Sequence, residues 1–215
     1  MSETEKRHRQ DAVGEKGAQS DIWLITGGGR SGKSGYGEAL AAEKSAEERG
    51  KGAAGRPGVL YIATAVACDG EMAERIARHQ AGRPHDWITW ERYRGLSDIG
   101  REFDEGAFGT VLLDCIGNLL MGILFEEAPD ADNCTAADFG QVERLAMSEI
   151  DTLCAYARKH GKRLVFVTNE VGMGIIPETP YARCYRDALG RINKHAAEAS
   201  DRAVLMVAGL PVTLK

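Results

Sequence analysis

A glycine-rich run that ends in lysine and serine, GGGRSGKS, is the part of the sequence best suited to hold a polyphosphate. Its Walker A positions follow a short apolar run and precede a run rich in Ala, Glu and Leu, and they are Gly27, Gly32, Lys33 and Ser34. Glycines let the backbone turn its N–H groups toward a phosphate, and the start of the following helix adds partial positive charge. Lys33 would meet the β and γ phosphates, and Ser34 would hold Mg²⁺. We therefore expect a nucleoside triphosphate site rather than a plain glycine-rich surface turn.

A carboxylate at the end of another apolar run suits the metal side of such a site. Asp114 closes the run VLLD, which is the Walker B arrangement, in which a rigid strand holds a carboxylate near Mg²⁺. The alternative is that this carboxylate caps the next helix. The apolar run and the position of Asp114 at its end favour the metal-side role.

His79 is a candidate nucleophile because it lies at the end of EMAERIARHQ, just before the turn-prone AGRP. A neutral imidazole is a competent nucleophile toward phosphorus near its ordinary pKa of about 6.5. A histidine beside a bound triphosphate also serves simply as a hydrogen-bond donor, and spacing alone does not choose between these roles. The other histidines are less informative: His8 lies in the N-terminal tail, His160 at a helix C-terminus, and His85 and His195 at expected surface positions.

The loop NEVGMGIIPE, residues 169–178, follows a further apolar run, and loops in this position often line binding sites. Its Glu170 is a candidate acceptor for a substrate hydroxyl or a helix N-terminus. The following helix carries Arg183, Arg186 and Arg191, which would either meet phosphate or form a solvated helix face. The sequence leaves both interpretations open.

Six apolar runs alternate with helix-forming segments, which predicts a mainly parallel α/β sheet with right-handed crossovers. The expected strands are residues 21–26, 59–64, 87–90, 110–115, 163–168 and 203–209, the last closing the sheet. The expected helices are residues 33–48, 70–80, 96–103, a run ending at 127, 137–160 with Gly161 as its C-cap, and 180–199. Ligands of such sheets lie beyond the carboxyl ends of the strands. We therefore expect one crevice lined by GGGRSGKS, Thr64, Glu91, Asp114 and Asn169–Glu170.

Composition limits the class of protein. At 215 residues and 43% hydrophobic, the chain can bury one core, so we expect one domain over residues 21–215 after a disordered tail, residues 1–20. A net charge of −5 argues against a nucleic-acid partner. The five cysteines have no zinc spacing and are expected to be reduced thiols. No apolar run is long enough to span a membrane, so we expect a soluble, cytoplasmic protein.

Several motifs occur in the order found in one enzyme family, and their combination is specific. They are GGGRSGKS, VLYIAT, DGEMAERIARHQAGRP, WERY, VLLDC, VTNEVGMGIIPE and ARCYRDALGRIN. Over about residues 22–215, the chain closely resembles the bifunctional adenosylcobinamide kinase/adenosylcobinamide-phosphate guanylyltransferase family of cobalamin biosynthesis. Very many NTPases share the Walker A motif alone, whereas its combination with RIARH and TNEVGMGIIPE is highly specific.

The resemblance implies a P-loop, RecA-like fold, a homo-oligomer that is a trimer in the family, and two reactions. ATP or GTP first phosphorylates the terminal hydroxyl of adenosylcobinamide. GMP then passes from GTP to that phosphate, which releases pyrophosphate and gives adenosylcobinamide-GDP. The guanylylated histidine of the family corresponds to His79, with Lys33 as the second catalytic residue and Ser34 and Asp114 at the metal. The implied nucleotide contacts are Gly27, Gly28, Gly29, Arg30, Ser31, Gly32, Lys33, Ser34, Thr64, Ala65, Val66, Gln80, Ala81, Gly82, Arg83, Glu91 and Asp114.

Two departures from the family pattern follow VLLDC. Gly117 and Gly122 stand where the family often has Thr and Asn, with Asn118 nearby, so the kinase reaction has less support from residue type than the guanylyl transfer. An enzyme that retains one half-reaction is therefore the first alternative. A GTP-binding switch would carry an NKxD tetrapeptide, which this sequence lacks. An ATP-only small-molecule kinase is the last alternative, and it would form no GMP adduct.

Overall fold

The computed structural model describes residues 21–50, 58–66, 70–128 and 135–215. For residues 44–50, 71, 72, 75, 78, 79 and 136 it describes the backbone only. The expected tail, residues 1–20, lies outside the described residues, as do Cys68 and Cys134. The described cysteines, Cys115, Cys154 and Cys184, are free thiols.

In the described part of the chain, seven strands form one sheet in the order β3-β2-β4-β5-β1-β6-β7. Their bounds are β1 Asp21–Gly27, β2 Val59–Ala63, β3 Ile88–Glu91, β4 Thr110–Asp114, β5 Arg163–Val167, β6 Arg202–Val207 and β7 Leu210–Thr213. The first six pair in parallel, which confirms the predicted mainly parallel α/β sheet. The prediction that residues 203–209 close the sheet is wrong. Ala208 and Gly209 both adopt positive φ angles, 51° and 82°, which suit a tight hairpin, and β7 returns antiparallel along β6 as the edge strand.

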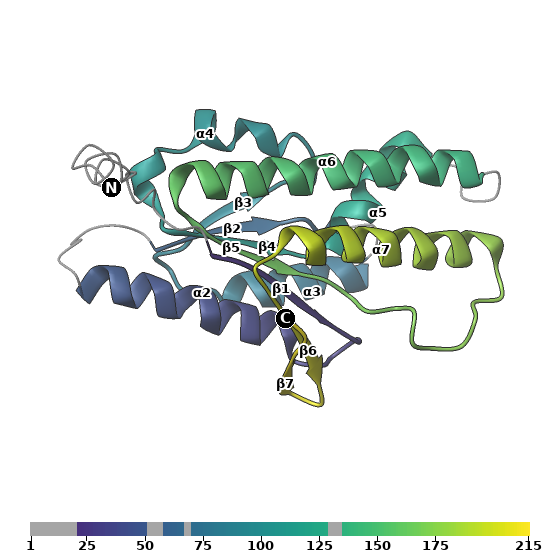
Figure 1. Cartoon of the computed structure of the whole chain (residues 1–215), viewed down its shortest axis with the longest axis horizontal. Coiled ribbons are helices and arrows are strands. Elements are labelled where there is room, and N and C mark those ends of the chain that lie inside the picture. Colours follow the sequence, from purple (N-terminus) through teal and green to yellow (C-terminus); the bar gives the residue numbers. More distant parts are fainter. Residues whose placement is uncertain (1–20, 51–57, 67–69, 129–134) are drawn as a thin grey trace, which may run out of the picture.

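Helices cover both faces of this sheet, with α2 and α3 on one face and α4 to α7 on the other (Figure 1). Their bounds are α2 Lys33–Gly50, α3 Gly70–Ala81, α4 Ile99–Glu102, α5 Ile116–Glu127, α6 Ala136–His160 and α7 Pro180–Ala199, with the short 3-10 turns η1 Leu96–Asp98 and η2 Glu105–Ala107. Strands buried on both faces alternate their side chains between two cores. Leu113 and Phe166 belong to the core under α5, α6 and α7, whereas Leu112 and Val165 belong to the core under α2.

Two helix ends show how local residue chemistry decides the length of a helix. Gly161 ends α6 in the left-handed conformation, with φ of 60°, which confirms the predicted C-cap. The helix expected over residues 96–103 is reduced to η1 and the single turn of α4. It stops there because Phe103 adopts an extended backbone and packs edge-on against Trp90 and Phe108.

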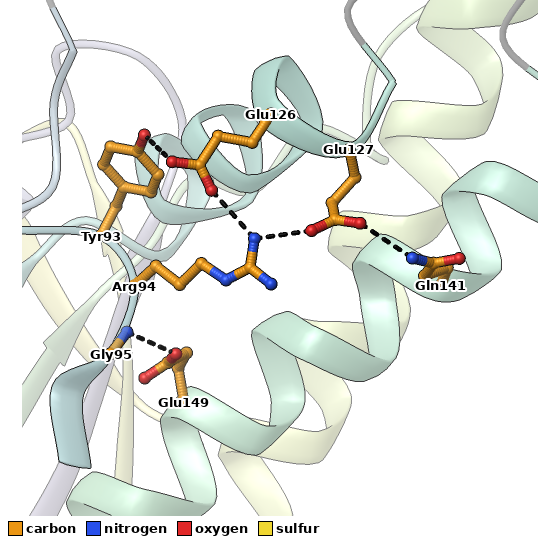
Figure 2. A network of polar contacts seen from close by, with 7 residues as sticks. All are labelled: Tyr93, Arg94, Gly95, Glu126, Glu127, Gln141 and Glu149. Carbon is orange, nitrogen blue, oxygen red and sulfur yellow. Dashed lines mark hydrogen bonds and ion pairs between the residues drawn. The ribbon is translucent and has the colours of Figure 1, made fainter.

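A polar network ties the segment after β3 to helices α5 and α6 (Figure 2). Its members are Tyr93, Arg94, Gly95, Glu126, Glu127, Gln141 and Glu149. The guanidinium of Arg94 donates to Glu126 at 2.9 Å and to Glu127 at 2.6 Å. The carboxylate of Glu149 accepts from two successive backbone N–H groups at the start of η1, at 2.7 and 2.8 Å. Because β3 ends at Glu91, these contacts fix the chain just after a candidate site residue.

Gly122 of α5, one of the two departures from the family pattern, is packed against the ring of Tyr93. A Cβ atom at Gly122 would lie 2.6 Å from two ring carbons of Tyr93. We predict that Gly122→Ala lowers the free energy of unfolding by roughly 1 kcal/mol, because overpacking outweighs the gain in helix propensity. Urea unfolding measures this change. In a Tyr93→Ala background the same substitution should be neutral or stabilising, and an equal destabilisation in both backgrounds would contradict the packing explanation.

Candidate active site

The loop between β1 and α2 is held in a tight turn by its own side chains and backbone. Lys33 is buried, and its Nζ donates to the carbonyl of Gly28 at 3.0 Å across the loop. A Cβ atom at Gly27 would lie 2.6 Å from Ser31 Oγ and 2.7 Å from the carbonyl oxygen of Met206. Only glycine therefore fits at the first Walker A position, because the loop rests directly on strand β6.

The β6–β7 hairpin also supports the loop, a contact that is not predicted from the sequence. The backbone N–H of Gly209 donates to the carbonyl of Ser31 at 3.1 Å. Gly32 adopts φ of 90°, and a Cβ atom there would lie 3.4 Å from Gly209 Cα. A turn-prone Ala-Gly pair between two short apolar runs is the sequence signal that would have indicated this hairpin.

A cavity of about 270 Å³ opens where the loop meets the carboxyl ends of the strands. Seven of the expected nucleotide contacts line it, namely Lys33, Ser34, Ala65, Gln80, Arg83, Glu91 and Asp114. Six further lining residues are Tyr61, Ala63, Ile76, Cys115, Asn118 and Asn169. The expected crevice is thus present, and strand ends from β2 to β5 and the start of α2 all contribute to it.

Asp114 and Arg83 meet inside this cavity through the side chain of Tyr61. The Tyr61 hydroxyl donates to Asp114 Oδ2 at 3.0 Å, and Arg83 Cζ lies 3.9 Å from the centre of the Tyr61 ring. Burial and the neighbouring Asp114 carboxylate raise the pKa of Tyr61 above its ordinary value. Burial, followed by the Asp114 charge, also raises the pKa of Glu38, while Arg83 opposes that rise. Acidic and basic groups are therefore concentrated at one end of the cavity.

The cavity is also lined by the C-terminal turn of α3 and the end of β3. Gln80 Nε2 donates to Glu91 Oε1 at 2.5 Å. Arg83 Nη1 approaches Thr89 Oγ1 at 3.4 Å, a long contact. The backbone of His79 belongs to α3 and directly precedes Gln80, while its side chain lies outside the described residues.

Thr64 takes a different role from the expected nucleotide contact. It is fully buried, and its hydroxyl donates to the carbonyl of Cys115 at 2.7 Å while accepting the Cys115 N–H at 2.8 Å. The hydroxyl is thus engaged with the chain that follows β4, where the Asp114–Cys115 peptide bond is cis. Burial raises the pKa of Cys115 to about 11, so this thiol stays protonated beside the cavity.

The other expected contacts are not among the residues that line this cavity. Those outside it are Gly27, Gly28, Gly29, Arg30, Ser31, Gly32, Thr64, Val66, Ala81 and Gly82. Glu170 accepts from the Gly172 N–H within its own loop. Arg183 donates to carbonyls of that loop, Arg186 pairs with Asp187, and Arg191 pairs with Glu143 of α6. The contacts of these arginines favour the solvated helix face over phosphate binding.

The donor set of the cavity fits a divalent ion that arrives with a nucleotide. Ser34 and Asp114 line the same space and supply a hydroxyl and a carboxylate. Among the described residues, no group of three or more His, Cys, Asp or Glu side chains would hold a metal on its own. Mg²⁺ commonly takes one or two protein oxygens and completes its shell with phosphate oxygens and water. The site thus suits an ion shared with a polyphosphate.

A glycine-rich loop after an interior strand of a mainly parallel sheet, followed by a helix and faced by a strand-end carboxylate, defines a P-loop nucleotide-binding protein. No described helix is long and apolar enough to cross a membrane.

Comparisons with known proteins are consistent with this class and narrow it. The family described as cobinamide kinase / cobinamide phosphate guanyltransferase matches residues 23–214. The bifunctional adenosylcobalamin biosynthesis proteins CobU of Escherichia coli and Salmonella typhimurium are 39% and 40% identical over 192 residues, which span 89% of this chain and 98% of each relative. The bifunctional adenosylcobalamin biosynthesis protein CobP of Pseudomonas aeruginosa is 36% identical, over 89% of this chain and 96% of its own. The chain therefore belongs to the cobinamide kinase / cobinamide phosphate guanyltransferase family, which confirms the resemblance drawn from its motifs, and it is a transferase.

The double hydrogen bond of Thr64 leads to a stability prediction. Thr64→Val keeps the shape of the side chain but leaves the buried N–H of Cys115 without its partner, which should lower the free energy of unfolding by about 1–3 kcal/mol. Thr64→Ser keeps the hydroxyl and is the matched control, with a smaller loss. Chemical unfolding monitored by circular dichroism measures both variants. Equal losses for the two would show that the methyl group, not the hydroxyl, matters at this position.

Proposed function

We propose that the cavity catalyses both reactions of its family: phosphorylation of adenosylcobinamide by ATP or GTP, and transfer of GMP from GTP to the resulting phosphate in adenosylcobalamin biosynthesis. One observation carries this proposal. A single cavity joins the P-loop residues Lys33 and Ser34 to Asp114 and to the C-terminal turn of α3. The expected polyphosphate site and the end of the helix whose backbone includes His79 thus border one cavity. We infer that residues 21–215 act together as this kinase and guanylyltransferase domain.

In the guanylyl transfer, a ring nitrogen of His79 attacks the α-phosphorus of GTP. An N–P bond forms, the bond from the α-phosphorus to the bridging oxygen breaks, and pyrophosphate leaves. A phosphate oxygen of adenosylcobinamide phosphate then attacks the same phosphorus and displaces the imidazole, which gives adenosylcobinamide-GDP. Lys33 neutralises charge on the departing pyrophosphate. One difficult displacement is thereby divided into two easier ones.

The remaining residues bind and orient the nucleotide. Arg83 lines the cavity two residues beyond the end of α3, where its guanidinium would clamp a phosphate. Glu91 would accept hydrogen bonds from guanine N1 and N2 or from the ribose. Ser34 and Asp114 would hold Mg²⁺, which neutralises charge on the phosphates when bound. In the kinase reaction the same loop would present the γ-phosphate to the cobinamide hydroxyl.

We also infer, from the family and the sequence, that the protein assembles as a homotrimer and acts in the cytoplasm. Neither property enters the chemistry above. Sedimentation of the purified chain tests the assembly directly.

His79→Ala tests the covalent step. Because the nucleophile is lost, intact-mass analysis after incubation with GTP and Mg²⁺ should show a GMP-sized increase in the wild type and none in the variant. Guanylyl transfer should fall by roughly a thousandfold or more, while phosphorylation of adenosylcobinamide stays within about threefold. His85→Ala, at an exposed position, is the matched control and should keep the adduct. A His79→Ala variant that transfers guanylyl groups normally would overturn the covalent step. GTP hydrolysis by the wild type without any adduct would favour a GTP-binding switch.

Glu91→Gln tests base recognition. Loss of the carboxylate should weaken GTP binding by about tenfold and leave ATP binding unchanged, because only guanine offers both the N1 and N2 donors. Titration calorimetry with each nucleotide measures the two affinities. Glu198→Gln, on the exposed face of α7, is the control. Unchanged affinity and selectivity in Glu91→Gln would show that this role is wrong.

A further inference from the structure

Tyr61 contacts both Asp114, which is proposed to hold the metal, and Arg83, which is proposed to clamp a phosphate, although it belongs to neither the Walker A nor the Walker B motif. Its side chain is 2% exposed, and it lines the cavity from the middle of β2. Its hydroxyl contacts Asp114, its ring lies under Arg83, and the ring of Trp87 lies 6.2 Å from it. One buried side chain is therefore shared by the two groups proposed to act on the nucleotide.

We propose that Tyr61 is a positioning residue for nucleotide transfer, an inference that rests on the proposed function. Its hydroxyl orients the carboxylate of Asp114 toward the metal-bound nucleotide. Its ring face holds the guanidinium of Arg83 above the cavity. The two roles belong to different atoms of the same side chain, so they are separable by substitution.

The sheet register places the hydroxyl and the carboxylate together. Tyr61 pairs with Leu112 and Ala63 pairs with Asp114 across β2 and β4, so Tyr61 and Asp114 are diagonal neighbours on one face of the sheet. The hydrogen bond engages Oδ2 of Asp114, a residue that lines the cavity.

The contacts of Arg83 indicate that the ring, rather than hydrogen bonds, holds its guanidinium. Within the described chain the side chain of Arg83 makes one hydrogen bond, to Thr89, which is 3.4 Å long, and its buried Nε has no hydrogen-bond partner among the described residues. Stacking on an aromatic face fixes a guanidinium without consuming its N–H donors. Those donors are thus available to a phosphate group.

The hydroxyl is tested with Tyr61→Phe, which keeps the ring. The probe is α,β-methylene-GTP, in which the bond broken by guanylyl transfer is not cleavable, titrated by calorimetry with and without Mg²⁺. We expect unchanged affinity without Mg²⁺, and about a tenfold rise in the Mg²⁺ concentration needed for the tighter complex, since one hydrogen bond to a charged group is lost. Tyr156→Phe is the matched control: this hydroxyl, on α6, has no hydrogen-bond partner in the described part of the chain. An unchanged Mg²⁺ requirement in Tyr61→Phe would overturn the role of the hydroxyl.

The ring is tested with Tyr61→Leu, compared with Tyr61→Phe. Loss of the aromatic face should weaken binding of α,β-methylene-GTP without Mg²⁺ by about three- to tenfold, and Arg83→Ala should abolish the difference between the two variants. Equal metal-free affinity of both Tyr61 variants would overturn the role of the ring. If Tyr61→Leu does not melt cooperatively, an NMR measurement on the wild type replaces this test. The Nε–H resonance of Arg83 is identified by its loss in Arg83→Ala. An upfield ring-current shift supports the stack, and a random-coil position overturns it.

Failure of this inference is distinguishable from failure of the proposed function. Asp114→Asn should raise the Mg²⁺ requirement further than Tyr61→Phe, and the wild type should form the GMP adduct. If Asp114→Asn binds Mg²⁺ and nucleotide like the wild type, or if no adduct forms, the proposed function fails and the role of Tyr61 fails with it. If both controls behave as expected and only the Tyr61 variants are unchanged, the positioning role alone is wrong.

Discussion

The direct packing of the nucleotide loop on strand β6 is the constraint on which the rest of the site depends. At Gly27 the backbone comes so close to Met206 that no side chain fits, and the loop is tied from its other side by the Gly209 N–H. A loop held in this way keeps its turn without a ligand, so little ordering entropy is lost when phosphate binds. The contact of Lys33 with the Gly28 carbonyl belongs to the same turn, and a phosphate would compete for that ammonium group.

Charge is the second requirement, because the chain carries a formal net charge of −5 and is proposed to bind anionic nucleotides. Positive charge is therefore needed locally, at the site itself. Lys33 and Arg83 line the same cavity as Asp114, and Glu38 is close enough for the charge of Asp114 to raise its pKa. Carboxylates within such a partly buried site attract a divalent ion, and cations attract the phosphates. A metal–nucleotide complex therefore satisfies both sets of charges at once, whereas a free nucleotide satisfies only one.

Those parts of the fold and site that depend on local patterns were predictable from the sequence. The continuous apolar runs predicted the six parallel strands. The Walker motifs predicted that Lys33 and Asp114 would lie near each other, and both line one cavity. Strand β7 was missed because its exposed LPVT run is short and contains proline, so neither burial nor periodicity marks it. The role of Thr64 was missed because it depends on the chain after β4, and residues 64 and 115 meet only in the folded sheet. The role of Tyr61 was not predicted either, because an aromatic residue inside an apolar run is normally interpreted as part of the hydrophobic core.

The position of each group in the sheet helps to explain how one cavity would serve two transfers. The loop that would hold the β and γ phosphates follows β1, which lies between β5 and β6 within the sheet, whereas Glu91 and the Gln80 contact belong to the edge strand β3 and the end of α3. A nucleotide bound between them would place its γ-phosphate and its α-phosphate toward different surroundings. Attack at the γ-phosphorus needs only the loop and an incoming hydroxyl, while attack at the α-phosphorus needs the imidazole carried by α3. The two reactions would then differ in which phosphorus is approached and from which side, with the same anchor for the polyphosphate in both.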